Sequence, residues 1–74
     1  MDMKEGEKLL KHEPYKKLEG YKKEHDITNA DIGRVLGISE TAVIKKNSGE
    51  SDYFLSEVKK LQKELNIPYH IFLP

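Results

Sequence analysis

The sequence predicts an all-α domain, a compact bundle of about five short helices, and three observations lead to this prediction. Apolar residues recur every three or four positions along most of the chain, as they do on one face of a helix. Residues that favour helix starts precede these stretches, and Gly or Asn follows them. The 74 residues leave room for one domain, and charged residues make up 35% of the chain, which suits a solvated helical surface.

Composition divides the chain into two parts. Residues 1–13 are polar and charged apart from Leu9 and Leu10. They are interpreted as an N-terminal arm or short helix, with a disordered tail as the alternative. Residues 14–74 carry the helical patterns and are expected to form the folded domain.

The first helix of the domain is expected from Pro14 to about His25. Proline suits the first turn of a helix, where its missing N–H costs nothing. Tyr15, Leu18 and Tyr21 follow at a spacing of three and mark one apolar face.

The second helix is expected to be short, about eight residues. Thr28 is predicted to cap its start, and Asp31 completes an acidic variant of the capping box. Gly37 ends the helix, where a residue that accepts a positive φ is needed. Ser39 is then predicted to cap a third helix that ends near Lys46, before an exit turn at residues 47–49.

A fourth helix is expected to begin after Ser51 or Asp52, either of which can act as its N-cap. Asn66 is predicted to adopt the left-handed conformation at its end, and Pro68 to open a last short turn. The inward stripe of this helix consists of Leu55, Val58, Leu61 and Leu65.

Residues 29–48 carry most of the functional information. Two short helices share a link centred on Gly37, and Gly33 lies where steeply crossing helices need a very small residue. Apolar residues at positions 32, 36, 38 and 43 are placed to fix the crossing angle. This pattern predicts a helix-turn-helix, and an ordinary helical hairpin inside a bundle is the alternative.

On these residues the chain resembles the lambda-repressor-like (Cro/XRE) class of helix-turn-helix regulators. The resemblance covers about residues 15–73 and rests on Thr28, Ile32, Gly33, Leu36, Gly37, Ile38, Ser39, Val43, Gly49 and the segment LSEVKKLQKELNIPYHIFL. More narrowly, the chain is similar to the small antirepressors, or modulators of repression, of lactococcal temperate phages. The resemblance implies a cytoplasmic protein of the bacterial host cell.

The resemblance also implies a functional site, because in this class the third helix enters the major groove of DNA. The positions implied to read bases or contact a partner are Ser39, Glu40, Thr41, Ile44 and Lys45. The positions implied to contact phosphates are Lys22, Asn29 and Lys46. Tyr53 and Phe54 are added as interface candidates, because aromatic residues are enriched at protein–protein interfaces.

Charge favours a protein partner over DNA. The chain holds 13 Lys and Arg and 13 Asp and Glu, whereas most dedicated DNA binders carry a positive excess. Glu40 repels phosphates although it can accept from cytosine, and Ile44 suits a protein interface. Glu50 and Asp52 add acid at the exit of the third helix, which suits a basic partner surface.

These observations predict a regulator of a phage transcriptional switch, an antirepressor that binds the N-terminal domain of a cognate repressor and blocks or modulates its operator binding. The alternative is a Cro-like repressor that binds operator DNA directly, and a heteromer that touches DNA is compatible with both. The chain has no Cys, and His12, His25 and His70 are too scattered for a metal pair. No catalytic constellation, cofactor, metal, membrane span or small-molecule substrate is expected.

Overall fold

The computed structural model describes residues 12–73, and every regular element in this range is helical. The helices are α1 (Lys16–Glu24), α2 (Asn29–Leu36), α3 (Glu40–Ser48) and α4 (Leu55–Leu65), followed by the 3-10 helix η2 (Tyr69–Phe72). The all-α prediction is confirmed. The described range holds four α-helices rather than five, because the segment after Pro68 closes as a single 3-10 turn. The predicted arm at 1–13 lies outside this range apart from its last two residues.

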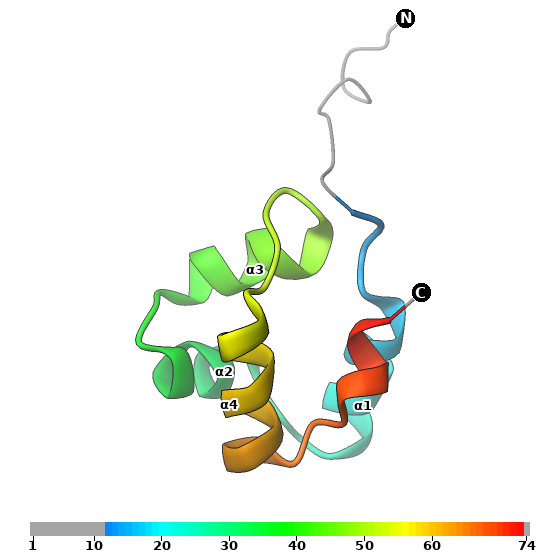
Figure 1. Cartoon of the computed structure of the whole chain (residues 1–74), viewed down its shortest axis with the longest axis vertical. Coiled ribbons are helices and arrows are strands. Elements are labelled where there is room, and N and C mark those ends of the chain that lie inside the picture. The colour runs from blue at the N-terminus through cyan, green and yellow to red at the C-terminus, as the bar shows by residue number, and fades with distance from the viewer. Residues whose placement is uncertain (1–11, 74) are drawn as a thin grey trace, which may run out of the picture.

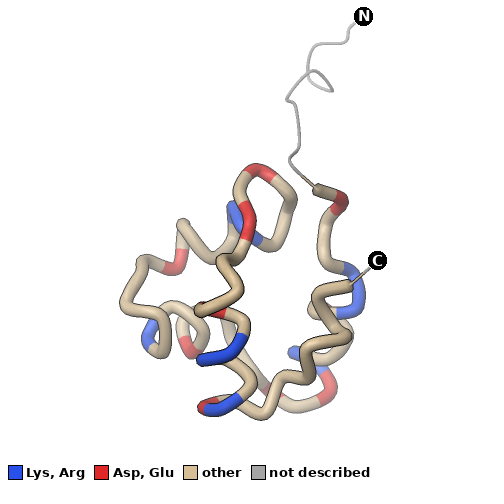
Figure 2. The backbone as a smooth tube through the Cα atoms, in the orientation of Figure 1, with Lys and Arg blue, Asp and Glu red and all other residues tan. Residues whose placement is uncertain are grey.

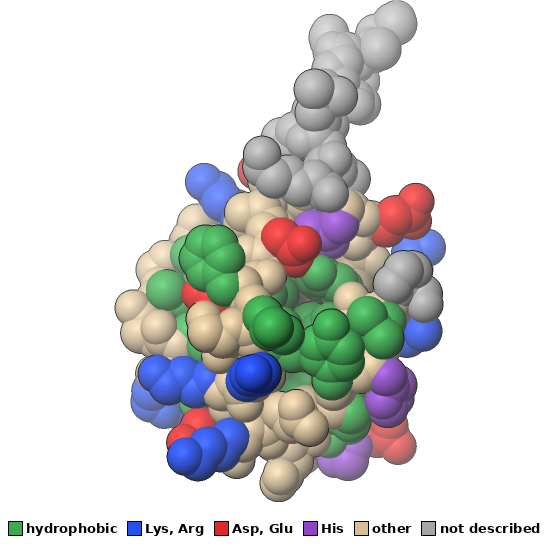
Figure 3. Space-filling model, viewed as in Figure 1, with side chains coloured by type: hydrophobic (Ala, Val, Ile, Leu, Met, Phe, Trp, Pro, Cys, Tyr) green, Lys and Arg blue, Asp and Glu red, His purple; other side chains and the backbone are tan. Residues whose placement is uncertain are grey.

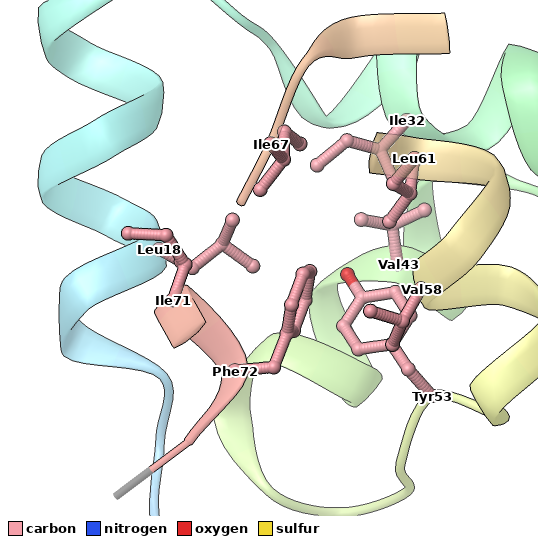
Figure 4. Packing of buried hydrophobic residues seen from close by; sticks show 9 residues of the cluster. All are labelled: Leu18, Ile32, Val43, Tyr53, Val58, Leu61, Ile67, Ile71 and Phe72. Carbon is pink, nitrogen blue, oxygen red and sulfur yellow. The ribbon is translucent and has the colours of Figure 1, made fainter. Parts of the chain in front are cut away.

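The helices surround one small apolar core. α1 and η2 lie side by side at one side of the molecule, and α2 packs against both α3 and α4 (Figure 1). Each helix, the α3–α4 loop and the C-terminal segment contribute buried side chains, which point toward one another in Figure 4. The core consists of Leu18, Ile32, Val43, Tyr53, Val58, Leu61, Ile67, Ile71 and Phe72.

Local capping signals explain where three of the helices begin or end. The Thr28 hydroxyl accepts from the Asp31 N–H (3.1 Å), and the Asp31 carboxylate accepts from the Thr28 N–H (2.9 Å). Ser39 caps α3 by accepting from the Ala42 N–H (3.1 Å). Gly37 adopts φ +72°, a backbone conformation that side-chain-bearing residues rarely adopt, and Asn66 ends α4 at φ 57°. These predicted caps are confirmed.

The predicted start of α1 and the predicted end of α3 are wrong. Pro14 lies ahead of Tyr15, the residue that precedes α1, so it is outside the first turn. α3 continues to Ser48 instead of ending near Lys46, because residues 47 and 48 stay helical up to the left-handed Gly49. Residue 47 therefore belongs to a helix face and not to an exit turn.

The start of α4 is also different from the prediction. The Glu57 carboxylate accepts from the Phe54 N–H (2.9 Å), which starts the helix at Leu55 rather than after Ser51 or Asp52. Asp52 instead accepts from the N–H of Tyr53 (2.7 Å) within the loop. Leu55 is 57% exposed, so it does not belong to the inward face of α4. Of the predicted inward residues, Val58 and Leu61 are buried and Leu65 is half-buried.

The capping box of α2 predicts a pH dependence of stability. Hydrogen bonds from the Thr28 backbone and then its hydroxyl, helped by the charge of Arg34, hold the pKa of the Asp31 carboxyl below its ordinary 3.8. A lowered folded-state pKa adds stability that is fully present above the unfolded-state pKa and is lost as the pH falls through the folded-state value. We expect Asp31→Asn to lower the Tm at neutral pH, with the difference from wild type shrinking below about pH 4.

Thermal unfolding followed by circular dichroism across the acid range measures this difference. Glu64→Gln is the matched control, since it neutralises an exposed carboxyl on α4. A difference in Tm between wild type and Asp31→Asn that stays constant down to the lowest pH would contradict a stabilising role for the ionised carboxylate.

Candidate functional site

The outer face of α3 brings together five of the predicted site residues. The inner face of the helix holds the buried residues Val43, Lys46 and Asn47. The residues exposed on or just before the helix are Ser39, Glu40, Thr41, Ile44 and Lys45. Ile44 is 49% exposed, which makes it the large apolar side chain that α3 turns to solvent.

A shallow cleft of about 270 Å³ runs beside Ile44 where α1, α2 and α3 meet. Its walls include Lys16 and Glu19 from α1, Asn29 from α2 and Ser48 from α3. The exposed apolar side chain of Ile44 thus borders a hollow edged by both a cation and a carboxylate.

Lys22 does not lie on this outer surface. Its side chain is buried, and its ammonium donates to the Asn29 side-chain oxygen (2.5 Å) and to the Glu19 carboxylate (3.1 Å). Phosphate binding by Lys22 would require these internal bonds to break, so the position of the side chain does not favour the predicted role.

Lys46 is withdrawn in the same way. Its ammonium donates to the backbone oxygen of Asp52 (2.8 Å), forms an ion pair with Glu57 (3.2 Å) and lies over the rings of Tyr53 and Phe54 at 5.5 and 5.2 Å. The stem of Lys46 is buried along the core. The position of Lys46 does not favour the predicted phosphate role either, because its charge already has partners inside the domain.

Asn29, the third phosphate candidate, belongs to a chain of polar side chains through the interior. The Asn29 side-chain oxygen accepts from Lys22 and from the side-chain amide of Asn47 (3.1 Å). The Asn47 oxygen in turn accepts from the hydroxyl of Tyr53. We call Lys22, Asn29, Asn47 and Tyr53 the polar chain, and it connects α1, α2, α3 and the α3–α4 loop.

The two aromatic interface candidates, Tyr53 and Phe54, differ in exposure. Tyr53 is 8% exposed, and its ring packs edge-on against Phe72 at 5.2 Å between centroids. Burial, and then the neighbouring Glu57, raise the pKa of the Tyr53 hydroxyl well above its ordinary value. Phe54 is 69% exposed. Tyr53 therefore packs into the core, whereas Phe54 has the exposure that an interface residue needs.

Acidic residues follow the loop between α3 and α4, as Figure 2 shows in red. Asp52 is exposed and accepts from the Tyr15 hydroxyl (2.5 Å); burial and this bond raise the pKa of Tyr15. Glu40 adds an exposed carboxylate at the start of α3. Since Lys22 and Lys46 lie inside, Lys45 is the exposed cation that α3 offers at this face.

Sequence reasoning missed two residues that organise the region. His12, considered in the sequence only as a metal ligand, lies against the α3–α4 loop with Nε2 2.7 Å from the backbone oxygen of Ser51, and its ring contacts that of Tyr15 at a tilt. Asn47 was assigned to a turn. Its spacing of four from the inward Val43 was the available signal, because residues four apart share a helix face.

No family model, curated protein or solved structure matches this chain. Within residues 12–73, no group of three or more His, Cys, Asp or Glu side chains is placed to hold a metal ion. None of the described helices has the length and apolar character needed to cross a membrane. The fold and the outer face of α3 define the class as a small all-helical domain with an exposed, mixed apolar and charged helix face.

Proposed function

We propose that α2, the link at residues 37–39 and α3 form a helix-turn-helix, and that this unit serves a regulator of a phage transcriptional switch. The regulator acts as an antirepressor, which binds the N-terminal domain of its cognate repressor and blocks or modulates operator binding. The helix-turn-helix assignment is supported by the contact at Gly33, where a Cβ would lie 2.7 Å from the backbone oxygen of Ile38. It is also supported by the left-handed Gly37, which allows a short link between two crossing helices.

One observation carries the preference for a protein partner. Lys22 and Lys46, the two lysines expected to bind phosphates, instead form ion pairs with Glu19 and Glu57 and donate to other acceptors within the domain. Phosphate neutralisation supplies much of the affinity of DNA-binding proteins, so a face that keeps its lysines inside is poorly suited to operator binding alone. An exposed Ile44 flanked by Glu40 suits the basic surface of a DNA-binding protein.

Direct operator binding is the second candidate function. It is favoured by the exposure of Ser39, Thr41 and Lys45, because hydroxyl and ammonium groups are common base readers in the major groove. A heteromer with the repressor can use these groups on DNA while Ile44 contacts protein.

The experiment is gel filtration with light scattering of the full chain mixed with the repressor domain encoded by the same phage, with and without operator DNA. We expect a one-to-one complex that excludes DNA. Ile44→Ser and Glu40→Lys should each weaken it about tenfold, because an interface depends on a few central anchors and on complementary charge.

Tyr69→Ser is the matched control, since Tyr69 is 46% exposed but lies on η2, away from α3. A chain that ignores the repressor and shifts operator DNA by itself would replace the antirepressor proposal with direct repression. Equal weakening by Tyr69→Ser and Ile44→Ser would mean that the contact lies elsewhere.

A further inference from the structure

The solvent face of α4 carries a row of lysines that the proposed function does not use. Lys59, Lys60 and Lys63 are exposed and lie within little more than one helical turn. Figure 2 shows Lys positions recurring on α4, and Figure 3 shows Lys and Arg side chains gathered over its lower end. This surface belongs to a different helix from the α3 face.

The lysines border a shallow, open groove. The groove has a volume of about 460 Å³ and is also lined by Ser56, Glu57 and the half-buried Leu36, which is the last residue of α2. We call this hollow the α4 groove. It combines an apolar side chain from α2 with a cationic wall from α4.

The positive charge of the α4 groove is not compensated within the described residues. None of its three lysines forms an ion pair with another residue in the range 12–73. The carboxylate of Glu57, one turn before Lys60, instead pairs with Lys46 and caps the N–H of Phe54. Lys59 and Lys63 are four residues apart, a spacing at which like charges slightly destabilise a helix.

We infer that the α4 groove binds an acidic peptide segment of a partner protein. Carboxylates of such a segment complement the three lysines, and an apolar side chain among them contacts Leu36. A nucleic-acid backbone matches the lysines but offers nothing to Leu36.

The test uses the full chain and a short fluorescent peptide of glutamates with leucines spaced one helical turn apart. Binding is measured by fluorescence anisotropy, and the site is mapped by amide chemical shifts. We expect shifts centred on Leu36 and on Lys59 to Lys63. Replacing the leucines of the peptide with serine should weaken binding several-fold, since apolar burial contributes to affinity.

The double variant Lys59→Glu and Lys63→Glu should weaken binding by about tenfold or more, because it reverses charge at the centre of the groove. The matched control is Lys16→Glu with Lys23→Glu, which changes the net charge equally at exposed positions of α1 and also removes a lysine from a last helical turn. Ile44→Ser should leave peptide binding unchanged, which separates this surface from the α3 face.

Three results would overturn the inference. Equal loss of peptide binding in the α1 and α4 double variants would indicate general electrostatic attraction without a specific site. Equal binding of the leucine-free peptide would remove the role of Leu36. Displacement of the peptide by duplex DNA at physiological salt, dependent on Lys59 and Lys63, would assign the groove to nucleic acid instead.

Discussion

Gly33→Ala is expected to cost about 2–3 kcal/mol of unfolding free energy, as forced overpacking of a tight contact does. The new Cβ would lie 2.7 Å from the backbone oxygen of Ile38, a distance that real Cβ atoms essentially never show. That oxygen cannot move alone, because the Ile38 N–H donates to the Gly33 oxygen at 2.9 Å and holds the link against α2. The crossing of α2 and α3 must therefore open to admit the methyl group.

Urea unfolding followed by circular dichroism measures this cost, and Gly20→Ala is the matched control. Gly20 lies within α1, and a methyl group added to it would meet no atom within 4 Å beyond the adjacent residues and backbone of its own helix, so the same substitution causes no clash there. Alanine is preferred over glycine in a helix, and the control should gain roughly 0.5–1 kcal/mol. A Gly33→Ala protein as stable as wild type would mean that the link between α2 and α3 is not tightly packed.

Asn47→Ala is expected to have the second large effect, a loss of about 2–3 kcal/mol, because it leaves buried polar partners unsatisfied. The Asn47 side chain is buried, accepts from the Tyr53 hydroxyl and donates to Asn29. Without it, the hydroxyl of Tyr53 stays buried with no acceptor, and the polar chain is cut between α2 and α3.

A double-mutant cycle with Tyr53→Phe tests this explanation. In the Tyr53→Phe background no hydroxyl is left unpaired, so Asn47→Ala should cost less there than in the wild type. The neighbouring Ser48→Ala is the control, since among residues 12–73 the Ser48 hydroxyl bonds only to the backbone oxygen of Lys45 on its own helix. Additive losses in the cycle would show that the two side chains do not depend on each other.

The sequence predicted best those features that depend on a few consecutive residues. The capping box at Thr28, the cap at Ser39 and the left-handed positions at Gly37 and Asn66 all follow from local backbone chemistry. The all-helical class follows from the same signals together with the apolar spacing. The start of α4 was missed because Glu57 caps it from within the helix, while the acceptor expected from Asp52 is used by the loop.

The candidate site was predicted only in part, because a side chain's charge does not indicate where it finds its partners. Lys22 meets Asn29 across a helix boundary, and Lys46 meets a backbone oxygen of the next loop. Pairs of this kind join different elements, so they can be identified only once the arrangement of the helices is known. Tyr53 and Phe54 are adjacent and both aromatic, and their opposite exposures depend on how the loop enters α4.

The two faces of α3 differ in what they contribute to the fold. Val43, Lys46 and Asn47 hold the helix from inside, whereas Thr41 and Ile44 contribute little to the core. Substitutions at exposed positions usually change stability by only about 0.5 kcal/mol in either direction. The outer face of α3 can therefore change by single mutations at little cost in stability, while the inner face maintains the fold.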